Sequence, residues 1–205
     1  MQDLFADTPV QVDLKESSAI LIRNILTPER SDSIFTSLRE STPWKQDKIN
    51  FMGKVRPVPR LAAWYSKTLQ SYFYSGIKVA AHPYTNLITE LNNTVEGATG
   101  FKFNSVLINL YRDGSDSVSW HADDEPSLGC SITIASLSLG VSRDFQLKRK
   151  DGQGKTITVM LENGSLLLMQ HPTQRYWLHQ IPKRQQTVSY THLRAHETRE
   201  DRGCR

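Results

Sequence analysis

The sequence predicts an α+β fold in which a β-sandwich or jelly roll forms the core and helices pack outside it. Two observations carry this prediction. Apolar residues recur at helical spacing in two segments before residue 100, whereas beyond that point they recur at every second residue, as in strands. Turn signals then divide the later part of the chain into several short strands, a spacing typical of sandwiches and barrels.

The first hundred residues contain one predicted strand and two predicted helices. The apolar stretch at residues 19–22 predicts the strand. The sequence Thr27-Pro28-Glu29 predicts a helix start, because it offers a capping hydroxyl, a proline at the first helical position and an acid in the first turn. The second helix is predicted from about Pro83 to Val95, where apolar residues recur every four positions, and Gly97 is expected to stop it.

The second half of the chain is predicted to be built from strands. The clearest two-residue alternation runs from Val106 to Tyr111. Turn signals occur at Asp113-Gly114, Asp151-Gly152 and Asn163-Gly164. Further strands are predicted at Ser131–Leu139, Lys155–Leu161, Ser165–Gln170 and Tyr176–Ile181.

Length and composition limit the class of protein. The chain has 205 residues, of which 38% are hydrophobic, which suits one domain with a real core. It contains no run near the roughly 20 apolar residues that a membrane helix needs, and its acidic N-terminus lacks the apolar stretch of a secretory signal. Only Cys130 and Cys204 occur, which is too few for a disulfide framework. We therefore expect an intracellular protein, cytoplasmic or nuclear, that makes no membrane contact and acts as a monomer.

The positive charge is concentrated at the C-terminus. The whole chain carries a net charge of +4, and residues 183–205 hold six basic against three acidic residues. The remainder of the chain is therefore close to neutral, and its basic pI is only weak support for a nucleic-acid partner.

A candidate metal site is formed by His121, Asp123 and His179. Residues two apart in extended backbone point to the same side, so His121 and Asp123 can converge on one cation. His179 lies in a later predicted strand and can supply a third ligand. Two histidines and one carboxylate form the facial triad of non-haem iron(II) oxygenases. Taken alone, a His-x-Asp pair is more often a surface histidine beside a solvated acid than a metal site.

Ordered sequence blocks around these residues resemble the AlkB-type iron(II)/2-oxoglutarate-dependent dioxygenases, in the branch that repairs alkylated nucleic acid. The resemblance covers roughly residues 18–183. The blocks that carry it are Pro59 to Tyr65, Tyr72 to Gly76, Phe103 to Gly114, Trp120 to Glu125, Ile134 to Gly140 with Arg143 and Phe145 following, Gly164 to Met169, and Gln174 to Lys183. It implies a double-stranded β-helix, or jelly-roll, core with flanking helices.

The resemblance also implies the cofactors and their ligands. It makes His121, Asp123 and His179 the Fe(II) ligands and the catalytic residues. It makes Asn109 and Tyr111 the residues that contact the co-substrate 2-oxoglutarate. The residues agree with this reading, since Asn109 and Tyr111 lie two apart on one face of a predicted strand. Without the resemblance, a capped strand end with a half-buried tyrosine explains the same two residues.

Eight residues match substrate-binding positions of this branch. Met52, Gly53 and Lys54 match a hairpin that probes the duplex, although the same residues also fit an ordinary β-turn with a buried methionine. Tyr72, Phe73 and Tyr74 match the pocket of a flipped-out base, although a strand packed in the core would look alike. Asp124 and Glu125 match acids that face the base and could favour a cationic methylated base.

The likeness ends near Lys183, and the chain departs from the family pattern beyond it. The family ends in a strand of the form Arg-x-Asn-x-Thr-x-Arg, whose first arginine pairs with the distal carboxylate of 2-oxoglutarate. Aligning Arg194 with the last arginine leaves Val188, Tyr190 and His192 at the other key positions. We therefore predict an oxygenase domain over residues 1–183 and an atypical C-terminal tail, of non-native character, over residues 184–205.

The implied function is oxidative demethylation of N-alkylated bases in DNA or RNA, such as 1-methyladenine and 3-methylcytosine. The reaction would use Fe(II), oxygen and 2-oxoglutarate, and it would release succinate, CO2 and formaldehyde. Two alternatives stay open: a 2-oxoglutarate oxygenase that acts on protein or lipid, and a nucleic-acid-binding module whose catalysis is impaired because the arginine strand is missing. A carbohydrate-binding jelly roll fits the fold class but gives no reason for the His-x-Asp and His179 set.

Overall fold

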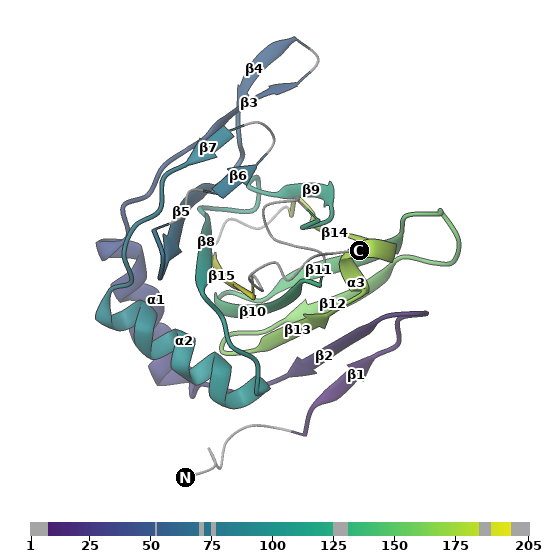
Figure 1. The fold of residues 1–205 in the computed structure, drawn as a ribbon, viewed down its shortest axis with the longest axis horizontal. Helices are drawn as coiled ribbons and strands as arrows, with labels where there is room; N and C mark the ends of the chain where they lie inside the picture. The colour runs from purple at the N-terminus through teal and green to yellow at the C-terminus, as the bar shows by residue number, and fades with distance from the viewer. Residues whose placement is uncertain are drawn as a thin grey trace.

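The computed structural model describes residues 8–51, 53–69, 72–74, 77–124, 131–184 and 190–197. Two antiparallel sheets stack face to face, and two helices cover the outer face of the larger sheet (Figure 1). This arrangement confirms the predicted α+β jelly roll with flanking helices. In the described part of the chain, no helix is both long and apolar enough to cross a membrane.

The larger sheet has seven strands in the order β1-β2-β13-β10-β15-β8-β5, and the smaller has four in the order β12-β11-β14-β9. Two further hairpins, β3–β4 and β6–β7, stand apart from these sheets. The strands are β1 (Val10–Val12), β2 (Ser18–Ile22), β3 (Lys48–Phe51), β4 (Lys54–Pro57), β5 (Leu61–Ser66), β6 (Tyr72–Tyr74), β7 (Ile77–Val79), β8 (Ser105–Tyr111), β9 (Val118–His121), β10 (Thr133–Gly140), β11 (Arg143–Arg149), β12 (Ile157–Leu161), β13 (Leu166–Gln170), β14 (Trp177–Ile181) and β15 (Tyr190–Glu197).

The helices are α1 (Pro28–Ser41), α2 (Asn86–Thr99) and the single turn α3 (Thr173–Tyr176). The first helix begins as predicted, because Oγ1 of Thr27 accepts the backbone N–H of Arg30 at 3.3 Å. The predicted limits of the second helix were wrong at both ends. The Thr85 hydroxyl caps it at 3.2 Å from the backbone nitrogen of Ile88, and the chain leaves it at Gly100, whose φ of +75° suits a residue without a side chain.

Gly97 therefore lies inside α2 and does not stop it. A glycine in a helix interior weakens it by about 1 kcal/mol, which the buried stripe of the same helix outweighs. That stripe consists of Ile88, Leu91 and Val95, each about 1% exposed.

Two apolar clusters explain why the strands of the larger sheet are apolar on both faces. On β10, Ile134 packs between the two sheets, whereas Ala135, Leu137 and Leu139 pack toward the helices. A sheet covered on both sides needs apolar residues at almost every position, so β10 has buried residues from Thr133 to Leu139. The cluster between the sheets ends at a pocket, and this pocket is where the candidate site lies.

Strand β15 lies between β10 and β8 and so completes the larger sheet. Its residues 190, 192 and 194 pair with Tyr111, Asn109 and Leu107. The sequence analysis did not predict this strand. The predicted boundary at residues 183 and 184 remains a prediction, as does the non-native character of the tail.

Candidate active site

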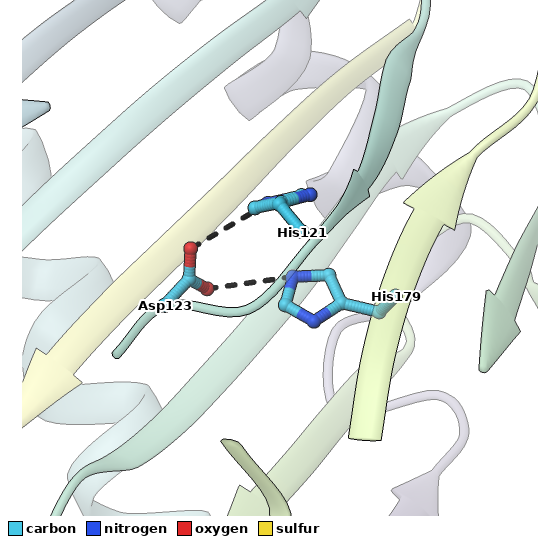
Figure 2. Close-up of side chains that lie close together, drawn as sticks. All are labelled: His121, Asp123 and His179. Atoms are coloured by element: carbon cyan, nitrogen blue, oxygen red, sulfur yellow. Dashed lines mark ion pairs between the residues drawn. The ribbon is translucent and has the colours of Figure 1, made fainter. Parts of the chain in front are cut away.

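The three residues of the predicted iron site come together at one edge of the smaller sheet. His121 is the last residue of β9, Asp123 follows two residues later, and His179 is the central residue of β14. The register pairs His179 directly with His121, so their imidazole rings lie with centroids 4.2 Å apart. Potential ligand atoms of the three side chains all lie within 4.8 Å of one another. Figure 2 shows both imidazoles directed toward the carboxylate of Asp123.

The geometry of this group fits a divalent iron ion. Nε2 of His121 lies 3.5 Å from Oδ1 of Asp123, and Nε2 of His179 lies 3.5 Å from Oδ2. These separations exceed those of a charge-assisted hydrogen bond, but they suit donor atoms that surround a common cation. Two neutral imidazoles and one carboxylate are the donor set that Fe(II) takes in oxygenases, with further positions left for small ligands. Asp123 and His179 are only 4% and 1% exposed, so a cation bound here would be largely shielded from water.

Neighbouring groups fix the orientation of these side chains. Nδ1–H of His121 donates to the carbonyl oxygen of Ser119 at 2.8 Å, which leaves the Nε2 lone pair facing Asp123. The ring of Phe145 stacks on His179 at 5.2 Å with an interplanar angle of 17°. The backbone N–H of Asp123 donates to Oε1 of the buried Gln174 at 3.0 Å. Ligands held in this way are already ordered before an ion binds.

A pocket extends from the iron end between the two sheets. Asn109 and Tyr111, the predicted co-substrate contacts, are buried on β8 and line this pocket together with His121 and Asp123. Nε–H of Arg60 donates to Oδ1 of Asn109 at 2.9 Å. Because guanidinium can only donate, this bond fixes which end of the Asn109 amide is oxygen. The other lining residues are Asp47, Val58, Ala62, Val79, Leu107 and Val118.

Arg143 connects the parts of the chain that carry the site. It is 2% exposed, and its guanidinium donates to the carbonyl oxygens of Asp116 at 3.1 Å and Pro182 at 2.8 Å. The same group lies over the ring of Tyr111, 5.7 Å from its centroid. One buried cation therefore holds the loop between β8 and β9 against the end of β14.

The structure describes the predicted substrate-binding residues only in part. Gly53 forms the turn between β3 and β4 with a φ of +74°, and Lys54 is exposed at the start of β4. Tyr72, Phe73 and Tyr74 form β6, which pairs with β7. Met52 and Glu125 lie outside the described residues. Asp124 is absent from the residues that line the pocket, and its 56% exposed carboxylate lies 2.6 Å from Nζ of Lys150.

The sequence analysis missed three residues of the site. Arg60 and Gln174 lie within the quoted blocks, but nothing in their spacing points to Asn109 or to the backbone of Asp123. Asp47 lies outside every quoted block. Arg60 and Asp47 line the pocket and Gln174 accepts from the backbone of Asp123, each from a segment distant in the chain, so only the folded sheets bring them to the site.

Comparison with known proteins agrees with this geometry. The profile of the 2OG-Fe(II) oxygenase superfamily matches residues 18–205. Alpha-ketoglutarate-dependent dioxygenase alkB homolog 3 of Bos taurus is 39% identical over 169 residues, which are 76% of this chain and 57% of the relative. DNA oxidative demethylase ALKBH2 of Mus musculus is 34% identical over 169 residues, which are 78% of this chain and 71% of the relative.

A solved structure supports the fold. The structure of OsALKBH1 superposes with a TM-score of 0.65 at 14% identity and covers 91% of this chain and 99% of that chain. The chain spans well under two thirds of the length of several curated relatives, for example 57% of the Bos taurus protein. The superfamily description names both Fe(II) and 2-oxoglutarate, which fit the His-Asp-His group and the adjoining pocket. The chain thus belongs to the 2OG-Fe(II) oxygenase superfamily and, within it, to the AlkB-type dioxygenases.

Proposed function

We propose that this chain is an oxidative demethylase of N-alkylated bases in DNA or RNA, of the 1-methyladenine and 3-methylcytosine type. The observation that carries the proposal is the convergence of His121, Asp123 and His179 at a pocket that Asn109 and Tyr111 also line. The relatives named as alkB homolog 3 and as DNA oxidative demethylase ALKBH2 support the same reaction class. We further propose that the protein works as a monomer inside the cell.

In this proposal the three side chains at the iron end hold Fe(II), and Asn109 and Tyr111 bind 2-oxoglutarate. Bound Fe(II) supplies the oxidising chemistry, in which one atom of O2 enters succinate, CO2 is released, and the other atom enters a C–H bond of the methyl group. The resulting N-hydroxymethyl base loses formaldehyde and a proton, which restores the base. The chain itself orients the ligands through Ser119 and Gln174 and keeps water from the reacting methyl group with apolar walls.

The hairpin β3–β4 supports a nucleic-acid substrate. Figure 1 shows it projecting from the two stacked sheets, and Lys48, Lys54 and Arg56 on its strands are exposed. Exposed cations on a projecting hairpin suit contacts with phosphates, which supply much of nucleic-acid affinity. We propose that Met52, Gly53 and Lys54 at its tip contact the nucleic acid and that the β6 strand, Tyr72 to Tyr74, borders the extruded base.

The test is an incubation of the protein with Fe(II), 2-oxoglutarate and a single-stranded oligonucleotide that contains one 1-methyladenine, followed by mass measurement of the oligonucleotide. The proposal predicts the loss of one methylene unit, CH2, and the formation of succinate. Succinate with an unchanged oligonucleotide would indicate an oxygenase with a different substrate. Oligonucleotide binding without succinate would instead support the binding module with impaired catalysis.

A further inference from the structure

The pocket carries a permanent cation, Arg60, to which the proposed function gives no role. Arg60 lies directly before β5, is 9% exposed and lines the pocket. Among the described residues that line it, Arg60 is the one arginine or lysine, and a guanidinium stays charged throughout the physiological pH range. Its Nε–H donates to Oδ1 of Asn109 at 2.9 Å, so the charge lies beside a proposed contact of 2-oxoglutarate.

The two acids among the described lining residues have partners of their own. Asp123 belongs to the candidate iron group, in which its two carboxylate oxygens lie 3.5 Å from the Nε2 atoms of the two histidines. Asp47 forms an ion pair with Lys45, whose Nζ lies 3.2 Å from Oδ1. The charge beside Asn109 therefore comes from Arg60, and it favours an anion at this part of the pocket.

The bond to Asn109 does not by itself explain an arginine at this position. It uses one of the five N–H groups of the guanidinium, and a neutral amide could donate the same bond. A charge that is withdrawn from water costs free energy, which an anionic ligand offsets.

2-Oxoglutarate is such an anion, with a carboxylate at each end. A metal ion at the iron group would balance the 2-oxo acid end, whereas the distal carboxylate needs a partner from the chain. The sequence analysis predicts Val188 at the position of the arginine that is this partner in the family, and valine carries no charge. Arg60 carries one, and its planar set of N–H donors matches a carboxylate.

We infer that Arg60 pairs with the distal carboxylate of 2-oxoglutarate and supplies the charge that Val188 lacks. The inference deepens the proposed function and rests on its use of 2-oxoglutarate as co-substrate. It assigns the charge that binds this carboxylate to the segment before β5, and not to the C-terminal segment of the chain.

The test measures the binding of two 2-oxo acids to the full chain loaded with Fe(II), without oxygen and without an oligonucleotide. One is 2-oxoglutarate, and the other is 2-oxopentanoate, in which a methyl group replaces the distal carboxylate. The absorbance of each anaerobic complex gives its Kd. The unaltered chain should bind 2-oxoglutarate at least about 30-fold more tightly than 2-oxopentanoate, since a buried charge pair forms with only one of them.

Arg60→Met keeps the length of the side chain and removes its charge and its donors. It should raise the Kd of 2-oxoglutarate about 30-fold and that of 2-oxopentanoate less than about threefold, so that the preference is nearly lost. Arg60→Lys keeps the charge without the planar donors and should retain a preference of about tenfold. Arg39→Met, at an exposed position on α1, is the matched control and should leave both Kd values unchanged. Thermal melts of all variants would identify any loss of folding.

Two results would overturn the inference. Equal weakening of both 2-oxo acids by Arg60→Met would mean that Arg60 only orients Asn109. An unaltered chain that binds the two acids equally well would mean that no cation meets the distal carboxylate. The mass assay on the unaltered chain separates this inference from the proposed function. Demethylation with a preference that Arg60→Met leaves intact would refute the inference alone, whereas the expected loss of preference without demethylation would refute the proposed function alone.

Discussion

The iron end and the co-substrate end of the pocket come from different sheets. His121 and His179 lie on β9 and β14 of the smaller sheet, whereas Asn109 and Tyr111 lie on β8 of the larger one. At the iron end, His121, Asp123 and His179 form a group that could hold a metal ion, and each is oriented by a neighbour. At the co-substrate end, the sequence analysis predicts Val188 at the position of the family's distal arginine. We therefore predict a complete metal site beside an incomplete carboxylate site in the same pocket.

Removing one of the predicted iron ligands should abolish stable iron binding. We expect Asp123→Ala or His179→Ala to lower turnover at least about 1,000-fold, because a divalent ion held by the two remaining side chains is easily lost. Iron retained after dialysis, measured by metal analysis, checks the cause. His82→Gln, which alters a histidine outside the pocket lining, should retain iron normally. Full iron occupancy in either ligand variant would show that the site has been assigned wrongly.

Placing an arginine at position 188 should strengthen co-substrate binding, if Val188 occupies the position of the family's distal arginine. A buried carboxylate that gains a bidentate arginine gains roughly 2 kcal/mol or more, so Val188→Arg should lower the Kd of 2-oxoglutarate at least about tenfold. The absorbance of the anaerobic Fe(II)–2-oxoglutarate complex measures this Kd without turnover. Val188 lies outside the described residues, so the neighbouring Ser189→Arg is the control for added charge. An equal gain in both variants would contradict the alignment of this strand with the family pattern.

Removing the connection between the two ends should destabilise the whole chain. Arg143→Met deletes a buried cation that three backbone carbonyl groups accept from, those of Asp113, Asp116 and Pro182. We expect the free energy of unfolding to fall by about 3 kcal/mol, because the carbonyl group of Asp116 stays buried without its donor and the part-buried carbonyl groups of Asp113 and Pro182 lose theirs. Urea denaturation measures the change, and Lys155→Met at an exposed position is the control. A loss below about 1 kcal/mol would mean that the loop and β14 hold together without this residue.

The smallest expected effect concerns Glu96, far from the pocket at the end of α2. Burial disfavours its charge, but hydrogen bonds from Lys102, the backbone N–H of Phe103 and Asn92 outweigh this and hold the pKa of Glu96 at about 2. A carboxyl whose pKa is lowered on folding stabilises the protein above its unfolded pKa of 4.5 and loses that contribution as the pH falls toward 2.

Glu96→Gln should therefore cost about 1 kcal/mol at pH 7, since the lysine partners are exposed and screened, and should cost little at pH 2.5. Thermal melts of both proteins at the two pH values provide the measurement. The iron affinity should not change, because Glu96 is absent from the pocket lining. A cost that grows on acidification would mean that folding does not lower the pKa of Glu96.

Much of the fold could be predicted because its signals are local. The cap at Thr27 and the alternation from Val106 to Tyr111 depend on neighbouring residues, and both predictions are confirmed. The end of α2 was wrong because tertiary packing carries the helix through Gly97. Strand β11 was missed because charged residues occupy most of its outward positions, and β15 because its sequence departs from the family pattern.

The residues of the candidate site also include some that sequence spacing predicts and others that only the fold identifies. His121 and Asp123 could be paired because residues two apart in extended backbone point to the same side. His179 could be added because it lies in a late strand of the same β region. Arg60, Gln174 and Asp47 could not be found, since each depends on contact between segments 49 or more residues apart or on the shape of the pocket. Sequence spacing identifies ligands that lie close together in the chain, and the fold identifies the residues that orient them.

The central claim is that iron bound by this triad oxidises a methyl group on a nucleic-acid base in the adjoining pocket. The most direct measurement is the ratio of formaldehyde to succinate formed from an oligonucleotide with 1-methyladenine, at a concentration that saturates the protein. The account predicts one formaldehyde for each succinate, and neither product in the Asp123→Ala variant. Succinate formed at the same rate with and without the oligonucleotide, and with no formaldehyde, would contradict it.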